Sequence, residues 1–285
     1  MGQKDIATKV LESYNDVFAD IVNVLLFNGE EVVKVSELTD QSPRSAYKAD
    51  GKYREIERDV AKRWKQGNIH VACIGMENQV KADVDMPLRV LAYDGAEYRA
   101  QLYHGGKNRY PVVTMVLYFN HDRRWDAPVS LFERVDVPDR FKRFVNDYRI
   151  NMFDIAFLTE KQVKLFKSDF RHVADYFVQK RSTGTYVGST DEIKHVQETL
   201  SMMAVLTNDH RFEEMMKVGD EGKEIRTMCD VLDRVEEKGR KEGVDLLVSA
   251  VMDLRDGMPD ELLTVKYGDD VANKAHLILV GVADR

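Results

Sequence analysis

The chain has 285 residues, of which 44% are hydrophobic and 32% are charged, a balance typical of a globular protein. Its net charge of −7 argues against a protein that binds nucleic acid over its whole surface, but a local basic patch stays open. No apolar run approaches the roughly 20 residues of a membrane helix, and no signal peptide is recognisable, so we expect a cytoplasmic protein without a membrane partner.

The first predicted elements are a helix and a hairpin. Residues 5–28 carry apolar side chains at three- and four-residue spacing, and Asn28-Gly29 is a typical helix stop. Two strand-like runs follow, at 53–64 and 69–79. The turn residues between them, 65–68, include Gly67 and indicate a hairpin.

The next segments alternate between helix and strand. Apolar spacing predicts a helix over residues 86–102, and the near-continuous apolar run at 110–119 is typical of a strand buried on both faces. Residues 150–158 favour a further strand. This change of period predicts an α/β fold, in which a mixed central sheet is flanked by the helices at 5–28 and 86–102.

The C-terminal part of the sequence is predicted to be helical. Periodic segments lie at about 160–180, 190–216 and 222–255, and Gly239 and Gly243 leave a hinge or a helix–helix turn open in the last one. We expect one domain over residues 1–180 and a mostly helical region over 181–285. The C-terminal helices are the surface through which we would expect a homo-oligomer to form.

Three polar side chains are predicted to meet at the end of the hairpin. Residues two apart in a strand share a face, so Glu77 and Gln79 project together. Facing residues of antiparallel strands have a constant sum of residue numbers. Pairing Asp59 with Glu77 gives a sum of 136 and places the turn at residue 68, inside the turn found independently. One β-bulge would change this register.

Two carboxylates beside an amide suit a hard divalent cation. Mg²⁺ takes one or two carboxylates, keeps several waters and binds phosphate oxygens, and a bound metal lowers the pKa of an attacking water. A structural alternative stays open, in which Asp59 pairs with Arg58 or Lys62 and Glu77 only ends a strand. The basic residues at 54–65 are either a phosphate-binding strip or a solvated strand face.

The sequence resembles the Rpn family, whose members are described as recombination-promoting nucleases or transposases of the PD-(D/E)XK superfamily. The resemblance covers roughly residues 1–180 and is loose in the helical half. It rests on the opening helix, on an Asp-containing run, on an apolar strand that ends in Glu-Asn-Gln, on the helix after it, and on the long strand at 110–119. Their matching residues are Phe18-Ala19-Asp20-Ile21, Arg58-Asp59-Val60, Gly75-Met76-Glu77-Asn78-Gln79, and Arg89, Tyr93, Tyr98 and Gln101.

The resemblance implies a restriction-endonuclease-like PD-(D/E)XK core and a metal-dependent DNA endonuclease, acting in recombination or in mobile-element movement. Mg²⁺ or Mn²⁺ would be the cofactor and DNA the partner. Asp59, Glu77 and Gln79 would be catalytic, and the metal would be bound by Asp59, Glu77 and, from the opening helix, Asp20.

Gln79 departs from the lysine of the superfamily motif and cannot supply its positive charge to the transition state. This departure leaves an alternative function open, that of a DNA-binding or accessory protein without efficient cleavage. In either case we expect the DNA contacts to come from Arg54, Arg58, Lys62 and Arg89.

Overall fold

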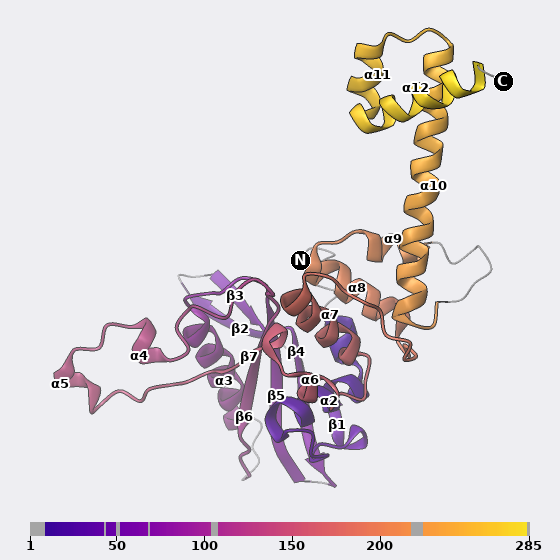
Figure 1. The fold of residues 1–285 in the computed structure, drawn as a ribbon. Coiled ribbons are helices and arrows are strands. Elements are labelled where there is room, and N and C mark those ends of the chain that lie inside the picture. Colours follow the sequence, from indigo (N-terminus) through magenta and orange to yellow (C-terminus); the bar gives the residue numbers. More distant parts are fainter. Residues whose placement is uncertain are drawn as a thin grey trace. The chain divides into compact units, whose positions relative to one another are not determined.

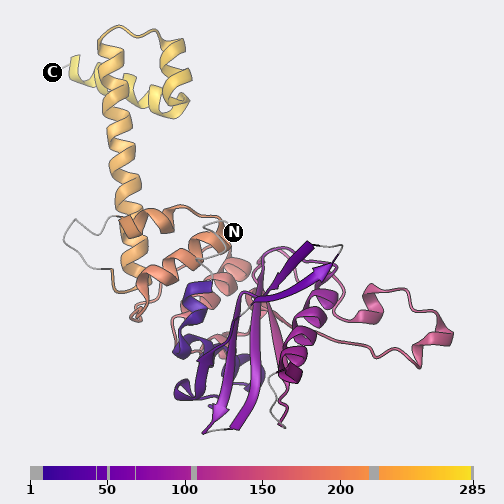
Figure 2. The same cartoon turned by 180° about the vertical axis from the view of Figure 1, so that it is seen from behind.

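A computed structural model describes residues 9–42, 44–49, 52–67, 69–103, 108–217 and 225–283. The chain separates into two compact units, residues 1–228 and 229–285 (Figures 1 and 2). The first unit contains all the strands of the described residues, and the second is helical. The domain boundary predicted at residue 180 falls inside the first unit, within helix α7 (Phe170–Thr183).

A five-stranded mixed sheet is the centre of the first unit. Its strands, in spatial order, are β1 (Leu38–Asp40), β4 (Val60–Gln66), β5 (Ile69–Gln79), β6 (Val112–Tyr118) and β7 (Asn151–Asp154). β4 is antiparallel to β1 and β5, whereas β5, β6 and β7 run parallel. The predicted α/β fold with a mixed central sheet is therefore confirmed.

The predicted hairpin is β4 and β5, with the predicted register at its open end. Val60 pairs with Met76 and Trp64 with Ala72, which keeps the sum of 136, and a bulge between Trp64 and Lys65 shifts the register only near the turn. The run at 53–64 is two strands, because β3 (Lys52–Glu57) pairs with β2 (Arg44–Ala49) in a separate sheet. The chain changes sheets at Arg58-Asp59.

The helix predicted at 5–28 is interrupted. Residues 9–13 are helical, Tyr14 is extended (φ −67°, ψ 130°), and α2 runs over Asn15–Phe27. Asn28 (φ 52°) and Gly29 (φ 86°) end α2 in the left-handed conformation, at the predicted stop. The interruption changes which side of residues 9–13 is buried. Residues 5–8 lie outside the described part of the chain.

The two faces of the sheet are covered by different helices. On one face, Met86 and Val90 of α3 (Met86–Tyr103) pack against Val116 of β6. On the other, Phe119 packs against Phe170 and Phe177 of α7, and α2 lies over β4. Side chains alternate along β5, so odd-numbered residues face α3 and even-numbered residues face α2.

The chain after β6 makes a long excursion, residues 120–149, that carries the short helices α4 (Leu131–Arg134) and α5 (Asp139–Lys142). The chain then enters β7 and continues as helices. The predicted helices at 160–180 and 190–216 are each two elements, because turns divide them. The first consists of α6 (Glu160–Val163) and α7, and the second of α8 (Val196–Thr207) and α9 (Arg211–Lys217). Two short 3₁₀ helices lie elsewhere in the first unit, η1 (Val35–Glu37) before β1 and η2 (Ile155–Phe157) after β7.

The second unit consists of α10 (Met228–Arg255) without its first residue, α11 (Asp260–Tyr267) and α12 (Asp269–Ala283). Ala250, Leu263, Ala272 and Ala275 form its core. α10 continues through both glycines that left a hinge open, and ion pairs four residues apart, Glu237–Lys241 and Lys238–Glu242, span Gly239. No helix among the described residues has the length and apolar character needed to cross a membrane. Oligomerisation through these helices stays a prediction.

Candidate functional site

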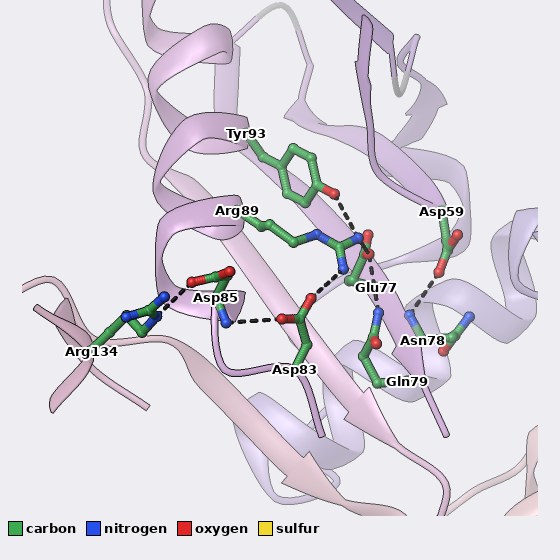
Figure 3. Close-up of polar contacts among 9 residues, drawn as sticks. All are labelled: Asp59, Glu77, Asn78, Gln79, Asp83, Asp85, Arg89, Tyr93 and Arg134. Atoms are coloured by element: carbon green, nitrogen blue, oxygen red, sulfur yellow. Dashed lines mark hydrogen bonds and ion pairs between the residues drawn. The ribbon is translucent and has the colours of Figure 1, made fainter. Parts of the chain in front are cut away.

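The candidate site lies at the carboxyl end of β5. Glu77 and Gln79 face α3, and Gln79 Nε2 donates a hydrogen bond of 3.2 Å to Glu77 Oε1. Asn78, between them, faces the opposite layer, towards the helical residues 9–13. This strand end therefore presents polar groups to both layers of the fold (Figure 3).

Asp59 lies beside this strand end, where β4 would continue if the chain did not change sheets. Its Oδ2 accepts a hydrogen bond of 2.7 Å from the backbone N–H of Asn78, and Lys9 Nζ lies 3.4 Å from its Oδ1. The hairpin register explains this position, because Val60 and Met76 are the last pair before it. The structure thus brings Asp59 and Glu77 to the same end of β5, as the register predicted.

Glu12 is a third carboxylate at the site, and the sequence reasoning missed it. It is fully buried, and Asn78 Nδ2 donates a 2.8 Å hydrogen bond to its Oε2. The helical periodicity predicted that Val10 and Tyr14 face the core, yet both are half-buried, and Leu11 and Glu12 are buried instead. The break at Tyr14 explains the difference, because it rotates residues 9–13 relative to α2.

Asp20, the residue predicted from the opening helix, is placed elsewhere. Its Oδ2 accepts hydrogen bonds from the backbone N–H groups of Lys167 (2.8 Å) and Ser168 (2.7 Å). It lines a pocket between α2 and the chain near residue 167, and neither Asp59 nor Glu77 lines that pocket. The structure therefore corrects this assignment: the acidic residue that the N-terminal helical region brings to the site is Glu12.

The pKa values of the three carboxyl groups are raised in the folded protein, so their ionised forms are disfavoured. Burial raises the pKa of Glu12 to about 8, and repulsion from Asp59 and Glu77 adds to the effect. Burial, followed by repulsion from Asp59, also raises the pKa of Glu77, and burial raises that of Asp59. Three buried oxygen atoms here have no hydrogen-bond partner: Glu12 Oε1, Glu77 Oε2 and Asn78 Oδ1. A buried carboxylate oxygen without a partner is costly, so this site is incomplete as a purely structural cluster.

Arg89 brings a positive charge to the site from α3. Its Nη2 atom is bonded to Glu77 Oε1 and lies 3.1 Å from the Tyr93 hydroxyl, while its Nη1 donates a 2.8 Å hydrogen bond to Asp83 (Figure 3). The Arg89 side chain is 39% exposed, so one side of this ion pair faces solvent. A guanidinium thus lies next to Glu77 and Gln79, where the superfamily motif would place its charge on a lysine.

Two of the predicted DNA contacts are not surface residues. Arg58 is 4% exposed and bonds to Thr114 beside Asp94, and Lys62 is 1% exposed, bonds to Asp40 and lies over the Phe18 ring. The prediction that these two side chains contact DNA is wrong, because both are buried and each is paired with a carboxylate. Arg54 lies in β3, but its side chain is outside the described part of the structure. Arg89 is the remaining candidate of the four.

The donors of this cluster suit a hard divalent cation. Carboxylate oxygens are the ligands that Mg²⁺ prefers, and it needs only one or two of them besides water and phosphate. In the described residues, no three acidic, histidine or cysteine side chains already converge as a metal centre. One oxygen of Glu77 is held by Arg89 and one of Glu12 by Asn78, which leaves the two unpartnered oxygens as the free donors.

Comparison with known proteins agrees with the fold. A family model described as "Putative transposase, YhgA-like" matches residues 27–204, more than half of the chain, and this span includes Asp59, Glu77, Gln79 and Arg89. No curated protein sequence and no solved structure matches the chain. The matched span runs from the end of α2 through the whole sheet and into α8. The chain therefore belongs to the YhgA-like transposase family, the Rpn family that its sequence resembles.

Proposed function

We propose that the protein is a metal-dependent DNA endonuclease that hydrolyses phosphodiester bonds, and that it serves in recombination or in the movement of mobile elements. The observation that carries the proposal is the pair of buried, unpartnered carboxylate oxygens, Glu12 Oε1 and Glu77 Oε2, at a strand end that also holds Asp59. Burying the carboxyl groups of Glu12 and Glu77 beside that of Asp59 is costly unless enough cations match their charge. A bound divalent cation would remove that repulsion.

Asp59 and Glu77 would hold Mg²⁺ or Mn²⁺, with Glu12 as the third oxygen donor. When bound, the cation would supply Lewis acidity towards the scissile phosphate and lower the pKa of the attacking water. Asn78 would position two of the donors, because its backbone N–H holds Asp59 and its side-chain amide holds Glu12. Asp20 has no part in this proposal.

Arg89 and Gln79 would bind the DNA phosphate. Gln79 can donate through its amide but carries no charge, whereas Arg89 offers a guanidinium suited to two phosphate oxygens. Arg89 is bonded to Glu77 here, and Asp83 gives it a second partner on the solvent side. Transfer of the guanidinium from Glu77 to the incoming phosphate would free a carboxylate oxygen for the cation while the positive charge stays in the site.

The proposal predicts that Asp59→Asn and Glu77→Gln abolish nicking of supercoiled plasmid DNA by the full-length protein in Mg²⁺ or Mn²⁺. Each change removes a ligand charge but little volume. Gln79→Ala should slow single-turnover cleavage by about 10²–10³-fold, the loss expected for one positioned hydrogen-bond donor in a preorganised site. EDTA should stop the reaction of the unchanged protein.

Two further variants distinguish Glu12, the acidic residue that the structure places near Asp59 and Glu77, from Asp20, the acidic residue predicted from the sequence. Glu12→Gln should lose most of the activity, whereas Asp20→Asn, which removes a similar carboxylate from the same N-terminal helical region, should retain it. The absence of metal-dependent nicking by the unchanged protein would contradict the proposal and favour the alternative, a nuclease-like fold that binds DNA without cutting it. Retention of cleavage in Glu77→Gln would contradict the assigned site.

A further inference from the structure

The excursion between β6 and β7 carries a group of charged and aromatic side chains that the candidate site does not use. All residues at 138–144 are exposed, and they include two phenylalanines, Phe141 at 48% and Phe144 at 70% exposure. Figure 1 shows α4 and α5 on a loop that projects away from the sheet. We call residues 138–144 the arm tip.

The arm tip is basic in a chain that is acidic overall. Residues 140–144 contain three basic residues and no acidic one, against a net charge of −7 for the whole chain. The Arg140 guanidinium lies over the Phe141 ring at 5.2 Å, and that of Arg143 over the Phe144 ring at 4.6 Å. Lys142 pairs with Asp139 at 2.8 Å, but in the described residues neither arginine forms an ion pair with a carboxylate. Exposed ion pairs contribute little, so these cations are available to an anionic partner.

The excursion begins at the end of the sheet that holds the candidate site. Tyr118, the last residue of β6, pairs with Gln79, and the excursion starts just after it. At its base, the Leu131 N–H bonds to the Tyr148 carbonyl at 2.8 Å, and Ser130 and Arg149 form a β-bridge. These contacts fix where the arm leaves the core.

An ion pair also ties the arm to the loop that follows the candidate site. Arg134 Nε, at the end of α4, lies 2.5 Å from Asp85 Oδ1 (Figure 3). The Asp85 N–H in turn donates to Asp83, the second partner of Arg89. The arm is therefore linked to Glu77 through a chain of polar contacts that runs from Asp85 to Asp83 and from there through Arg89.

We propose that the arm tip is a second DNA-binding element, which grips the backbone of a duplex at a distance from the phosphate that is cut. Arg140, Lys142 and Arg143 would neutralise phosphates, and Phe141 and Phe144 would insert against sugars and bases in the minor groove. Exposed apolar wedges next to basic side chains are a known way to hold and bend a duplex. This inference rests on the proposed function for the choice of DNA as partner. An anionic membrane surface could also attract such side chains, but the anchorage to the candidate site favours DNA.

Binding of a 30-base-pair duplex to the full-length Glu77→Gln protein, in EDTA, tests the arm without cleavage. Fluorescence anisotropy over a series of salt concentrations gives both the affinity and its salt dependence. The triple change Arg140→Ala, Lys142→Ala and Arg143→Ala should weaken binding by about 10-fold or more and flatten the logarithmic salt slope by about 0.9 for each phosphate that is no longer neutralised. Phe141→Ala with Phe144→Ala should weaken binding by about 5-fold or more but leave the slope unchanged.

The matched control removes the same charge elsewhere on the first unit. Lys161, Lys164 and Lys167 are exposed, and replacing all three by alanine should leave the affinity and the salt slope nearly unchanged. Equal losses of affinity in both triple variants, or no loss in the arm variant, would overturn the inference. So would arm-dependent binding to phosphatidylserine vesicles without arm-dependent binding to DNA. If the unchanged protein binds DNA through the arm but does not nick it, the proposed catalysis fails and this inference stands.

Discussion

The first unit contains two polar clusters, and they differ in whether all their buried polar atoms have hydrogen-bond partners. The arginine cluster consists of Arg58, Asp94, Thr114 and Tyr148. The carboxylate cluster consists of Glu12, Asp59 and Glu77, so Arg58 and Asp59 are neighbours in sequence but belong to different clusters. Most of these side chains are buried, and only Asp59 and Tyr148 are half-buried.

The arginine cluster satisfies its own charges. Arg58 Nη1 lies 3.1 Å from Thr114 Oγ1 and 3.7 Å from Asp94, Thr114 donates a 2.6 Å bond to Asp94 Oδ1, and the Tyr148 hydroxyl donates to Asp94 Oδ2. None of its described side-chain atoms is buried without a partner. The carboxylate cluster, by contrast, leaves two carboxylate oxygens unpartnered. A completed cluster indicates a structural role, and an incomplete one indicates a site for a ligand.

The largest effect that we expect is a difference in the free energy of unfolding between substitutions of Arg58 and of Asp59. Arg58→Met should lower the free energy of unfolding by about 3–5 kcal/mol, because it leaves the buried Asp94 carboxylate without its cation. Asp59→Asn, one residue away, should change it by less than about 1 kcal/mol in EDTA, because the amide oxygen can still accept from the Asn78 N–H. Urea unfolding followed by tryptophan fluorescence measures both, since Trp64 and Trp125 lie in the first unit.

Equal destabilisation by these two substitutions would contradict the division into a structural and a functional cluster. Gly75 provides a check on Arg58 that does not change any charge. A Cβ at Gly75 would lie 2.7 Å from Arg58 Nη1 and 2.8 Å from its Cδ, so Gly75→Ala should also destabilise the first unit. Gly67→Ala offers no matched control, because its φ is +60°, but Gly95→Ala does, since a Cβ there meets nothing within 4 Å.

A second effect, which depends on pH, should come from Glu12. The pKa of its carboxyl group is raised from 4.5 to about 8 in the folded protein. Between these values the folded state binds more protons than the unfolded state, so stability falls as pH rises from 4.5 to 8 and levels off above that. Glu12→Gln removes this loss. The variant should therefore gain stability relative to the unchanged protein as pH rises, by at most about 5 kcal/mol at pH 8–9 in EDTA.

Urea midpoints measured from pH 5 to pH 9 would show this gain as two diverging curves. Glu31→Gln, which replaces an exposed carboxylate, should give a curve parallel to that of the unchanged protein. Mg²⁺ should reduce the gain, because a cation that binds the ionised carboxylate cluster favours the folded state. Parallel curves for Glu12→Gln would show that burial at Glu12 carries no cost, and would remove the main argument for an incomplete site.

The parts of the site that could be predicted from sequence are those fixed by local geometry. The strand alternation placed Glu77 beside Gln79, and the turn at 65–68 fixed the register that brings Asp59 to them. The bulge at Trp64–Lys65 did not matter, because it lies on the turn side of the pairs that set this register.

The predictions that were wrong or missing concern residues whose environment depends on distant parts of the chain. Arg58 and Lys62 lie in an exposed-looking basic run, but their partners Asp94 and Asp40 come from other elements. Glu12 was missed because periodicity was extended through Tyr14, where the helix is interrupted. The residue type does not indicate this break in the helix, because Tyr14 is neither glycine nor proline. The sequence analysis assigned no element to residues 120–149, and the exposure of the arm tip became evident only in the structure.

The smallest effect compares two tyrosines, one in each environment. The Tyr148 hydroxyl donates to the buried carboxylate of Asp94, so Tyr148→Phe should cost about 1.5 kcal/mol, the range of a hydrogen bond to a charged group. The Tyr93 hydroxyl contacts Arg89, whose guanidinium is 39% exposed and also bonds to Asp83 and Glu77. Tyr93→Phe should cost less than about 0.5 kcal/mol, because water and the two carboxylates can satisfy the arginine. Tyr93→Phe should slow nicking even though it costs little stability, since the hydroxyl helps to position Arg89. A larger loss of stability for Tyr93→Phe than for Tyr148→Phe would reverse the assignment of the two clusters.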